Sequence, residues 1–545
     1  MFPATAWKKH RWEKQGENRS KEDYMGQKAY QNRLNTRQLA INMICSVIAF
    51  ALNLGIGFFI TPYITNQFGA EAYGFVTLAN DVANYASLFT IALNSMASRF
   101  LMLERARKNY KEAQQYFSSI FFANVVLSAI LLIPSLLCTC FLDRWLEIPT
   151  ILVAEVKLTF AVTFTSFLGN LIFSTHSNCY YLTNKLSIGS IRDALSTILR
   201  VSVIVFLLLF GAPRISYVAM GGLVSTLFAV TYNVVYTKKL TPELRVHLAG
   251  FSWDKLWRVL SSGIWNSITK LSQIFSSGLD LLVTNLLIGS TEMGYLAVAK
   301  TVPQVIVSFN ATIANTFSPN MMELYAKGDM EELKRTAKTA MKFMCLYVTI
   351  PNAILITMGE AFYSLWVPDQ PAKLLCVLSV LTVINSCVTG PLTPLYQIFT
   401  ITNKVKQSSI VLIVYGFSSI LLTFICLKTT DLGLFAVAGV SLIGSLLVAL
   451  CYHLPFSAIY IGLPWYAFFP EIFKGMLSMI VQCVIGFLVS CLVPQEQSWF
   501  MWFAGAIAAG GLGLIANVCL ILDADEKQIL FRQVLGKWRG RISKR

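Results

Sequence analysis

Segments of about 20 apolar residues recur along nearly the whole chain, and this recurrence limits its possible folds more than any other feature. A helix of that length crosses the hydrocarbon core of a bilayer, and unpaired backbone groups are too costly in lipid for irregular structure. Only 13% of the 545 residues are charged, against roughly 25% in soluble proteins. We therefore predict an all-α polytopic membrane protein with about 14 transmembrane helices. The segments lie at about 38–62, 73–98, 116–141, 155–178, 188–210, 215–236, 260–288, 294–318, 340–360, 374–399, 408–427, 433–453, 475–493 and 499–522.

The basic residues fall mostly on one side of this predicted topology. With the N-terminus in the cytoplasm, 36 of the 44 Lys and Arg residues lie in cytoplasmic tails, loops or helix ends. Five lie on the other side, and three (Arg200, Lys270 and Lys300) lie inside helices. This asymmetry follows the positive-inside rule and predicts that both termini are cytoplasmic. The net charge of +16 is thereby explained by membrane topology, and we expect membrane lipids rather than nucleic acid as partners.

Two glycine hinges, each between long apolar segments, reveal an internal duplication. Gly69 and Gly289 are 220 residues apart, and so are Gly74 and Gly294. Six helices per unit is an even number, so both units cross the membrane in the same sense. We predict two pseudo-symmetric six-helix lobes related by an axis along the membrane normal. Further matches at offsets of 219 to 221 are Trp145 with Trp366, Thr183-Asn184-Lys185 with Thr402-Asn403-Lys404, and Val218-Ala219 with Val437-Ala438.

The duplication and the loops between segments predict the domain boundaries. Two C-terminal helices lie outside the repeat and form an appendage. Residues 1–37 are polar and contain no cleavable signal, and either Met1 or Met25 is a suitable start. The predicted parts are a cytoplasmic tail (1–37), an N-lobe (38–237), a cytoplasmic linker (238–259), a C-lobe (260–455), an appendage (456–522) and a basic cytoplasmic tail (523–545).

Polar residues form a stripe on otherwise apolar helices of both units. Asn266, Lys270 and Gln273 are spaced by four and three residues, which places them on one helix face. Such a stripe faces partner helices or a wet cavity within the membrane. Some of these residues could serve only as hydrogen-bonding contacts between helices. The residues predicted to line a cavity are Lys270, Arg200, Lys300, Asn266, Gln273, Asn53, Asn84 and Gln304.

Charges inside helices indicate what such a cavity would bind. Lys270 and Arg200 have no acidic residue nearby in the sequence, and an unpaired cation at the bilayer centre costs on the order of 3 kcal/mol. Unpaired cations facing a polar interior therefore suggest an anionic substrate. Local pairing is the alternative for Lys300, which lies at a depth similar to that of Asp280.

Three further charged residues are candidates for ion pairs or for a coupling step. Asp81 is the main acidic residue of the matching first-unit helix, where it could pair with a cation or titrate. Asp280 is the candidate partner of Lys300. Arg192 has Asp193 beside it in the sequence.

No enzyme or metal signature is present in the sequence. The four histidines are scattered among a tail and helix ends, and most cysteines lie inside apolar segments. We find no phosphate-binding loop and no nucleophile elbow. We therefore expect no catalytic residues, no bound metal and no cofactor.

The ordered motifs resemble a known family. They are Tyr63 before Gly69, the Gly-x-x-x-Tyr-Gly hinge, Arg99, Gly263-Ile-Trp265, Asp280, Gly289, Gly294-Tyr295, Pro319, Leu324-Tyr325-Ala326-Lys327-Gly328-Asp329 and Leu365-Trp366. Through them the chain resembles the polysaccharide and lipid-linked oligosaccharide flippases of the multidrug/oligosaccharidyl-lipid/polysaccharide (MATE-like) exporter superfamily.

This resemblance implies a fold and a function. It implies two lobes in a V around a central cationic cavity, lined largely by the first, second, seventh and eighth helices. It implies a flippase in the bacterial cytoplasmic membrane that moves a glycan linked to polyprenyl diphosphate, with undecaprenyl as the expected chain, by alternating access. Glycan polymerases or glycosyltransferases are expected partners in cell-surface polysaccharide biosynthesis.

The first helix departs from two related subfamilies. It carries no charge between Arg37 and Glu71, whereas multidrug relatives have an acidic residue there and peptidoglycan-precursor flippases have arginines. A lipid II flippase, a cation-coupled drug exporter and a non-transporting scaffold of a glycan-assembly complex remain as alternatives.

Overall fold

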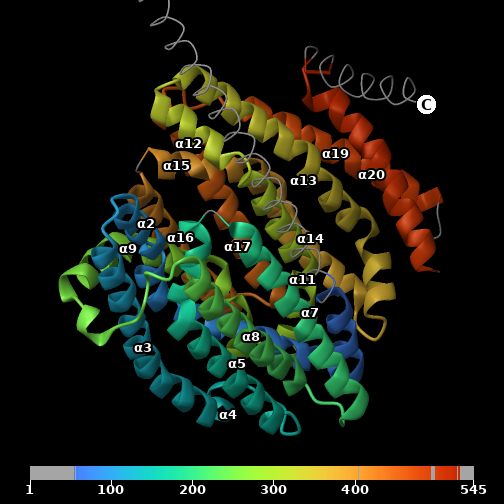
Figure 1. Ribbon diagram of the computed structural model, residues 1–545. Helices are drawn as coiled ribbons and strands as arrows, with labels where there is room; N and C mark the ends of the chain where they lie inside the picture. The colour runs from blue at the N-terminus through green and yellow to red at the C-terminus, as the bar shows by residue number, and fades with distance from the viewer. Residues whose placement is uncertain are drawn as a thin grey trace, which may run out of the picture.

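The computed structural model describes residues 55, 57–183, 185–402, 404–492, 498–523 and 526–527. Asn53, most of the first predicted segment, the predicted N-terminal tail and most of the predicted C-terminal tail lie outside these residues. Every regular secondary-structure element of the described residues is a helix, which confirms the predicted all-α class (Figure 1). Twelve of the described helices are long and apolar enough to span a membrane. The count of 14 therefore stays a prediction.

The first group of helices begins with the long segment Gly57–Arg105, which contains the first hinge. Gly69 has φ 84° there, a left-handed conformation that glycine adopts without steric cost. The last part of this segment is α2 (Ala97–Ala106). The helices that follow in this group are α3 (Tyr110–Cys140), α4 (Leu142–Trp145), α5 (Val153–Phe173), η1 (Ser174–Ser177), α6 (Asn178–Leu182), α7 (Leu186–Phe210) and α8 (Ser216–Leu240).

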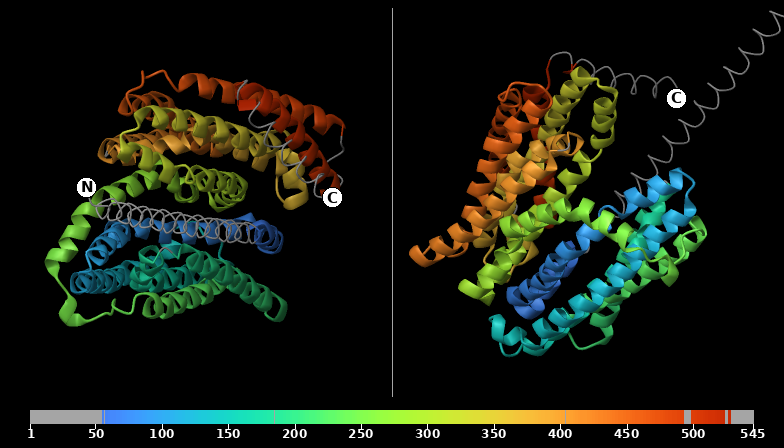
Figure 2. Two further views of the ribbon diagram at one scale, coloured as in Figure 1. Left: turned by 45° about the horizontal axis from the view of Figure 1, so that its top comes forward. Right: turned by 90° about the vertical axis from the view of Figure 1, so that its left-hand side faces the viewer.

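The second group begins with α9, which follows the 3₁₀ turn η2 (Leu248–Gly250) of the linker. Figure 2 shows the two groups as separate layers, with α9 running across from the first layer to the second. The helices are α9 (Trp253–Gln273), η3 (Ile274–Gly278), α10 (Asp280–Leu287), α11 (Ser290–Ala314), α12 (Ser318–Lys327), α13 (Met330–Trp366), α14 (Ala372–Leu392), η4 (Thr393–Leu395), α15 (Tyr396–Ile401), α16 (Val405–Thr429), α17 (Leu434–Val448), η5 (Ala449–His453) and α18 (Leu454–Tyr460).

The seventh predicted segment, 260–288, is not one continuous helix. The π-helical turn η3 separates α9 from α10, with the Leu279 N–H donating to the Ile274 carbonyl at 3.1 Å. This i→i+5 bond inserts an extra residue, and such bulges often occur at functional sites. With Lys270 on its face, α9 is also less apolar than its neighbours.

The fourth helix of each group breaks at the same point of the repeat. The break is η1, from Ser174 to Ser177, in the first group, and η4, from Thr393 to Leu395, in the second. Pro394 lies in η4, but η1 contains no proline. Proline is therefore not the common cause of the bend.

The appendage consists of α19 (Phe469–Leu492) and α20 (Trp499–Ile521), which pack on α13 at one edge of the molecule (Figure 1). A buried polar network holds the three helices together. The Asn517 amide donates to the Thr349 hydroxyl at 2.8 Å, and the Gln482 amide donates to the same hydroxyl at 3.1 Å. Ser478 donates to the Asn517 side-chain oxygen. These bonds fix the appendage without filling the space between the two groups.

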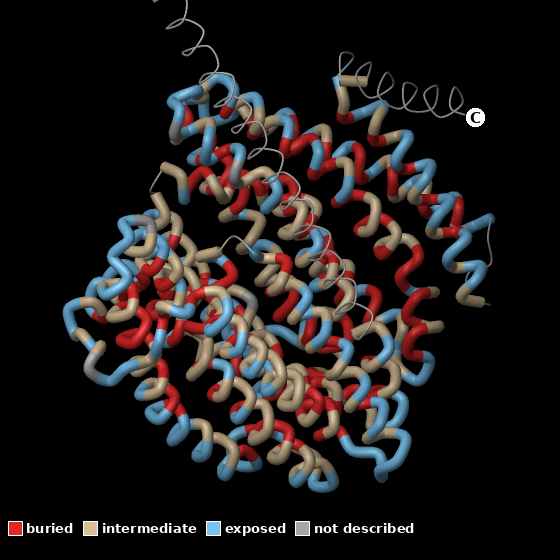
Figure 3. Tube along the Cα trace, in the orientation of Figure 1, coloured by how far each residue is buried: buried red, intermediate tan, exposed pale blue. Residues whose placement is uncertain are grey.

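The outward faces of the helices are apolar. Figure 3 shows the buried residues along the contacts between helices and the exposed residues on the outer faces. Phe210, Phe473 and Leu492 are 78%, 76% and 81% exposed. Exposed aromatic and aliphatic side chains in such numbers are typical of a surface covered by lipid. The protein is therefore a multi-pass membrane protein.

The two hinges touch each other at one end of the molecule, which we call the hinge end. A Cβ placed on Gly294 would lie 2.5 Å from the Ala70 carbonyl carbon and oxygen. Thr291 donates a hydrogen bond to Glu71, its equivalent 220 residues earlier. Contact between equivalent residues is expected where a pseudo-two-fold axis passes. The lobe boundaries drawn from the sequence remain predictions.

Each group also binds the hairpin of the other at the hinge end. The Asn285 side chain accepts from the Glu147 backbone N–H at 3.0 Å and donates to its carbonyl at 3.1 Å. The Trp366 indole donates to the Phe58 carbonyl at 2.8 Å. These reciprocal contacts close the hinge end around the space beneath it.

Candidate functional site

A cavity of about 820 Å³ lies between the two groups of helices. The long first helix, the α9–η3 segment and α11 all contribute to its wall. Its lining is mixed, with apolar residues beside charged, amide and hydroxyl groups. The polar lining residues are Tyr73, Thr77, Asp81, Asn84, Tyr85, Lys270, Gln273, Lys300, Thr301, Gln304 and Ser308.

Lys270 lines this cavity from the last turn of α9 and is half-buried. Among the described residues, none forms a hydrogen bond or an ion pair with it. Asp81 lines the cavity from the first long helix and likewise has no ion-pair partner in the described part of the chain. The cavity thus contains an ammonium group and a carboxylate on opposite helix groups, and neither forms an ion pair with a described residue.

Tyr85 connects the two groups at the π-helical turn. Its hydroxyl donates to the Gly278 carbonyl at 2.5 Å. Tyr73 makes a second connection, with its hydroxyl 3.0 Å from the Thr301 hydroxyl of α11. Both tyrosines line the cavity. The same side chains therefore form part of the cavity wall and join the two helix groups.

Lys300 and Asp280 form an ion pair, the local pairing that the sequence left open. The side chain of Lys300 is 26% exposed and that of Asp280 is 13% exposed. Lys300 lines both the central cavity and a second pocket of about 590 Å³ within the second group of helices. The pair stands at the wall between the two spaces, and its charges offset one another.

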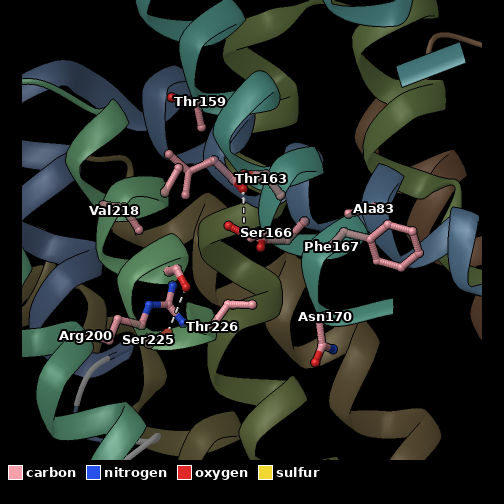
Figure 4. A pocket seen from close by; sticks show the side chains of 14 residues that line it. Ala83, Thr159, Thr163, Ser166, Phe167, Asn170, Arg200, Val218, Ser225 and Thr226 are labelled. Carbon is pink, nitrogen blue, oxygen red and sulfur yellow. Dashed lines mark hydrogen bonds between the residues drawn. The ribbon is translucent and has the colours of Figure 1, made fainter. Parts of the chain in front are cut away.

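Arg200 lies in a different place from Lys270. It lines a pocket of about 240 Å³ within the first group, between the long first helix, α5, α7 and α8 (Figure 4). The central cavity does not include it among its lining residues. The structure therefore separates two cations that the sequence grouped in one substrate site. With Asp81 present and Lys300 paired, the central cavity has less positive charge than the sequence predicted.

The remaining predicted residues are divided between the cavity and other contacts. Asn84, Gln273 and Gln304 line the cavity. Asn266 instead donates to the Ser95 hydroxyl at 3.0 Å, outside the lining. Asn53 lies outside the described residues.

Arg192 is held at a contact of its own. It forms an ion pair with Asp193 at 2.5 Å and donates to the Asn233 side chain at 2.7 Å. It lines none of the cavities described above. It is a structural contact in this conformation.

Tyr73, Tyr85 and Thr301 were missed as cavity residues by the sequence reasoning. Tyr73 belongs to the Gly-x-x-x-Tyr-Gly hinge, and Tyr85 lies four residues after Asp81 on the same helix face. The hinge motif and the four-residue spacing could have identified Tyr73 and Tyr85. Aromatic residues are also common on lipid-facing and core surfaces, so these patterns alone do not single out a cavity.

Comparison with known proteins agrees with this architecture. Residues 39–325 match the family of polysaccharide biosynthesis proteins. The chain is 26% identical over 516 residues to the uncharacterized membrane protein EpsK of Bacillus subtilis strain 168. The alignment covers 93% of this chain and 100% of the relative.

Solved structures share its fold at low sequence identity. The lipid II flippase MurJ, in an inward closed conformation, superposes with a TM-score of 0.64 and 15% identity, covering 91% of this chain and all of MurJ. An inward-facing multidrug resistance MATE family transporter of the MOP superfamily superposes with a TM-score of 0.61 and 15% identity. The superposition covers 78% of this chain and 98% of the transporter. A MOP superfamily transporter from Pyrococcus furiosus superposes with a TM-score of 0.57 and 14% identity, covering 78% of this chain and 96% of the transporter. That transporter is described as having a binding pocket of reverse polarity.

The family match covers more than half of the chain. The chain therefore belongs to the polysaccharide biosynthesis protein family, and it has the fold of the MATE-like superfamily. The resemblance drawn from the sequence motifs is confirmed at this level.

Proposed function

We propose that this polysaccharide biosynthesis protein is a flippase for a lipid-linked oligosaccharide. Its substrate is a glycan joined through a diphosphate to a polyprenyl chain, with undecaprenyl the expected lipid. It moves this substrate across the bacterial cytoplasmic membrane by alternating access between two lobes. The observation that carries the proposal is Lys270, whose ammonium group lies in a mixed polar and apolar cavity between the two helix groups without an ion-pair partner among the described residues.

The lining suits each part of such a substrate. A diphosphate carries about two negative charges near neutral pH, and leaving them unpaired in a low-dielectric cavity would be prohibitive. Lys270 supplies the positive charge. The amides of Asn84, Gln273 and Gln304 supply donors and acceptors for sugar hydroxyls.

Asp81 gives the cavity a way to release its substrate. The carboxylate competes with the diphosphate for the ammonium groups, so binding stays moderate and the substrate can leave. Protonation of Asp81 would favour substrate binding, and its ionisation would favour release. Because Lys300 is already paired with Asp280, Lys270 is the main cation for the diphosphate and Lys300 a secondary one.

The hinge end serves as the outer gate in this proposal. Thr291 and Glu71 bond there, and Gly74 and Gly294 allow close backbone contact. The substrate enters from the cytoplasmic side while this gate is closed. Opening then requires the hinges to separate, with the glycan leaving outward and the polyprenyl chain remaining in lipid.

The test is glycan export by variants of Lys270. Lys270→Ala should abolish or strongly reduce export in a flippase-deficient strain that carries a defined glycan pathway, at an unchanged level of protein in membranes. Lys270→Arg should retain part of the activity because charge is required more than shape. Lys428→Ala, at an exposed lysine 4.8 Å from the Phe424 ring centre, is the matched control. Full activity of a well-expressed Lys270→Ala variant would refute the mechanism.

A cation-coupled drug exporter is the second candidate, and Asp81 is the observation that favours it. A free carboxylate in the cavity suits binding of a cationic drug. In that case Asp81→Asn should abolish drug resistance, while Lys270→Ala should preserve or raise it. A non-transporting scaffold of glycan polymerases and glycosyltransferases would tolerate both substitutions.

A further inference from the structure

The pocket around Arg200 is separate from the central cavity, and its described lining combines a positive charge with neutral polar and apolar groups. Four helices line this partly open pocket of about 240 Å³. Its fourteen lining residues, shown in Figure 4, include hydroxyl and amide groups and one guanidinium. Of the described residues that line it, none is acidic.

Arg200 has no partner among the described residues. Its Nε atom is buried without a hydrogen-bond acceptor, and no ion pair or hydrogen bond to its side chain is present in that part of the chain. The first predicted membrane segment cannot supply a counter-ion, because residues 38–70 contain no Asp or Glu. An unpaired cation in a membrane helix is costly, so the half-buried Arg200 lacks a balancing negative charge in the described part of the chain.

Three neighbouring side chains have unused hydrogen-bonding groups. Thr163, Asn170 and Thr226 line the pocket, and none forms a side-chain hydrogen bond in the described part of the chain. Ser166 and Ser225, by contrast, donate to backbone carbonyls at 2.9 and 2.8 Å. Figure 4 shows Arg200 beside Ser225 and Thr226, with Asn170 on the other side of the pocket.

We propose that the N-terminal helix group binds a small inorganic anion in this pocket, with Arg200 as its counter-charge and Thr163, Asn170 and Thr226 as hydrogen-bond donors. Chloride and inorganic phosphate are the two abundant anions with this chemistry. The pocket is several times larger than the roughly 30 Å³ that one water occupies in the liquid, so an anion fits with some of its waters. Hydrogen bonds from a guanidinium to an anion are charge-assisted and therefore stronger than hydrogen bonds between neutral groups.

This site is not the diphosphate site of the transport proposal. The central cavity and the Arg200 pocket have no lining residue in common, and the pocket is too small for a lipid-linked glycan. The inference therefore does not rest on the proposed function. Loss of export in Lys270→Ala tests transport, whereas anion binding at Arg200 is measured without any transport.

The experiment is an anion titration of the purified full-length protein in lipid nanodiscs. Thermal unfolding is followed by tryptophan fluorescence in a gluconate buffer, while chloride or inorganic phosphate is added at constant ionic strength. A ligand that binds only the folded protein raises Tm in a saturable way. We expect a saturable rise of several °C for one of the two anions, and the anion that produces it identifies the ligand.

The variants locate the site. Arg200→Gln should abolish the rise, Arg200→Lys should weaken it, and Thr226→Val should raise the apparent dissociation constant several-fold. Arg192→Gln, eight residues earlier on α7 and already paired with Asp193, is the matched control and should respond like the wild type.

Several outcomes would overturn the proposal. They are an absent response to both anions in the wild type, an unchanged response in Arg200→Gln, and a response abolished by Lys270→Gln instead. If Arg200→Gln does not fold, Thr226→Val decides: an unaltered dissociation constant there rejects the site. Anomalous scattering from bromide beside Arg200 in crystals would support it directly, and bromide only elsewhere would count against it.

Discussion

The close contact at the hinge end makes Gly294 a sensitive point for the equilibrium between conformations. Gly294→Ala would place a Cβ 2.5 Å from the Ala70 carbonyl carbon and oxygen and 2.6 Å from the Glu71 nitrogen. All three are backbone atoms, so no side-chain rotation relieves the overlap. The two hinges must move apart, and the closed hinge end must lose stability.

The size of the effect follows from the kind of overlap. Adding a carbon to a well-packed contact costs about 1–3 kcal/mol. Since about 1.4 kcal/mol corresponds to a factor of ten in an equilibrium constant, the population with a separated hinge end should rise by roughly 5- to 150-fold. Gly439→Ala is the matched control, because a Cβ on Gly439 would meet no atom within 4 Å.

Thiol labelling measures this change. Thr301 lines the cavity and contacts Tyr73 at 3.0 Å, so a cysteine substituted for it reports access from the hinge end. The measurement uses a protein without its twelve native cysteines and a membrane-impermeant maleimide added from outside. Gly294→Ala should raise the labelling rate at least several-fold, and Gly439→Ala should not. An unchanged rate in a folded Gly294→Ala protein would refute the gate at the hinge end.

Three further predictions concern charge and stability. Asp280→Asn leaves Lys300 without its ion-pair partner and should destabilise the protein by about 3 kcal/mol, seen as a lower Tm; an unchanged Tm would mean that water already balances the pair. The hydrogen bond from Lys342 lowers the pKa of Asp523, which follows α20, so this contact stabilises the fold above the unfolded-state pKa of about 3.9 and is lost as the pH falls below it. Asp523→Asn should therefore lower Tm at pH 7, and its difference from the wild type should shrink as the pH falls through the lowered folded-state pKa of Asp523; equal values at pH 7 would contradict this. Asn517→Leu removes buried donors to α13 at a cost of about 1–3 kcal/mol; proteolysis should then release α19 and α20 first, and uniform cleavage would contradict this.

The fold could be predicted because its determinants are periodic. Apolar length predicts a spanning helix, and a 220-residue offset between Gly74 and Gly294 predicts a second copy of the same hairpin. What the offset did not predict is that the two hinges touch, with Thr291 bonded to its equivalent Glu71. Contact at an axis depends on how the two copies pack, and that packing is not encoded in the spacing.

The candidate site was harder to predict because helical periodicity assigns a face but not a neighbour. Lys270 and Arg200 both lie inside helices without nearby acids in the sequence, yet they line different pockets. Lys300 and Asp280 were joined correctly as one of two alternatives, since only a hinge separates their helices. The π-helical turn η3 was not predicted. A single extra residue leaves the segment just as long and apolar, so the sequence pattern gives no sign of it.

The internal repeat places the pocket of each helix group at matching positions, and this comparison shows where charge is balanced. Asn80 in the first pocket corresponds to Lys300 in the second, and Ser166 corresponds to Ser386, each pair 220 residues apart. In the second group Asp280 neutralises the cation. The residue equivalent to Asp280 in the first group is Ile60, and none of the described residues that line the Arg200 pocket is acidic.

An anion bound at Arg200 would therefore balance this cation as Asp280 balances Lys300, with a permanent partner in the second group and an exchangeable one in the first. Removing the exchangeable ion changes the charge of the first group alone. An effect of anion concentration that Arg200→Gln abolishes would then begin in the first group, on α7, and reach the hinge end through the helices that line the Arg200 pocket.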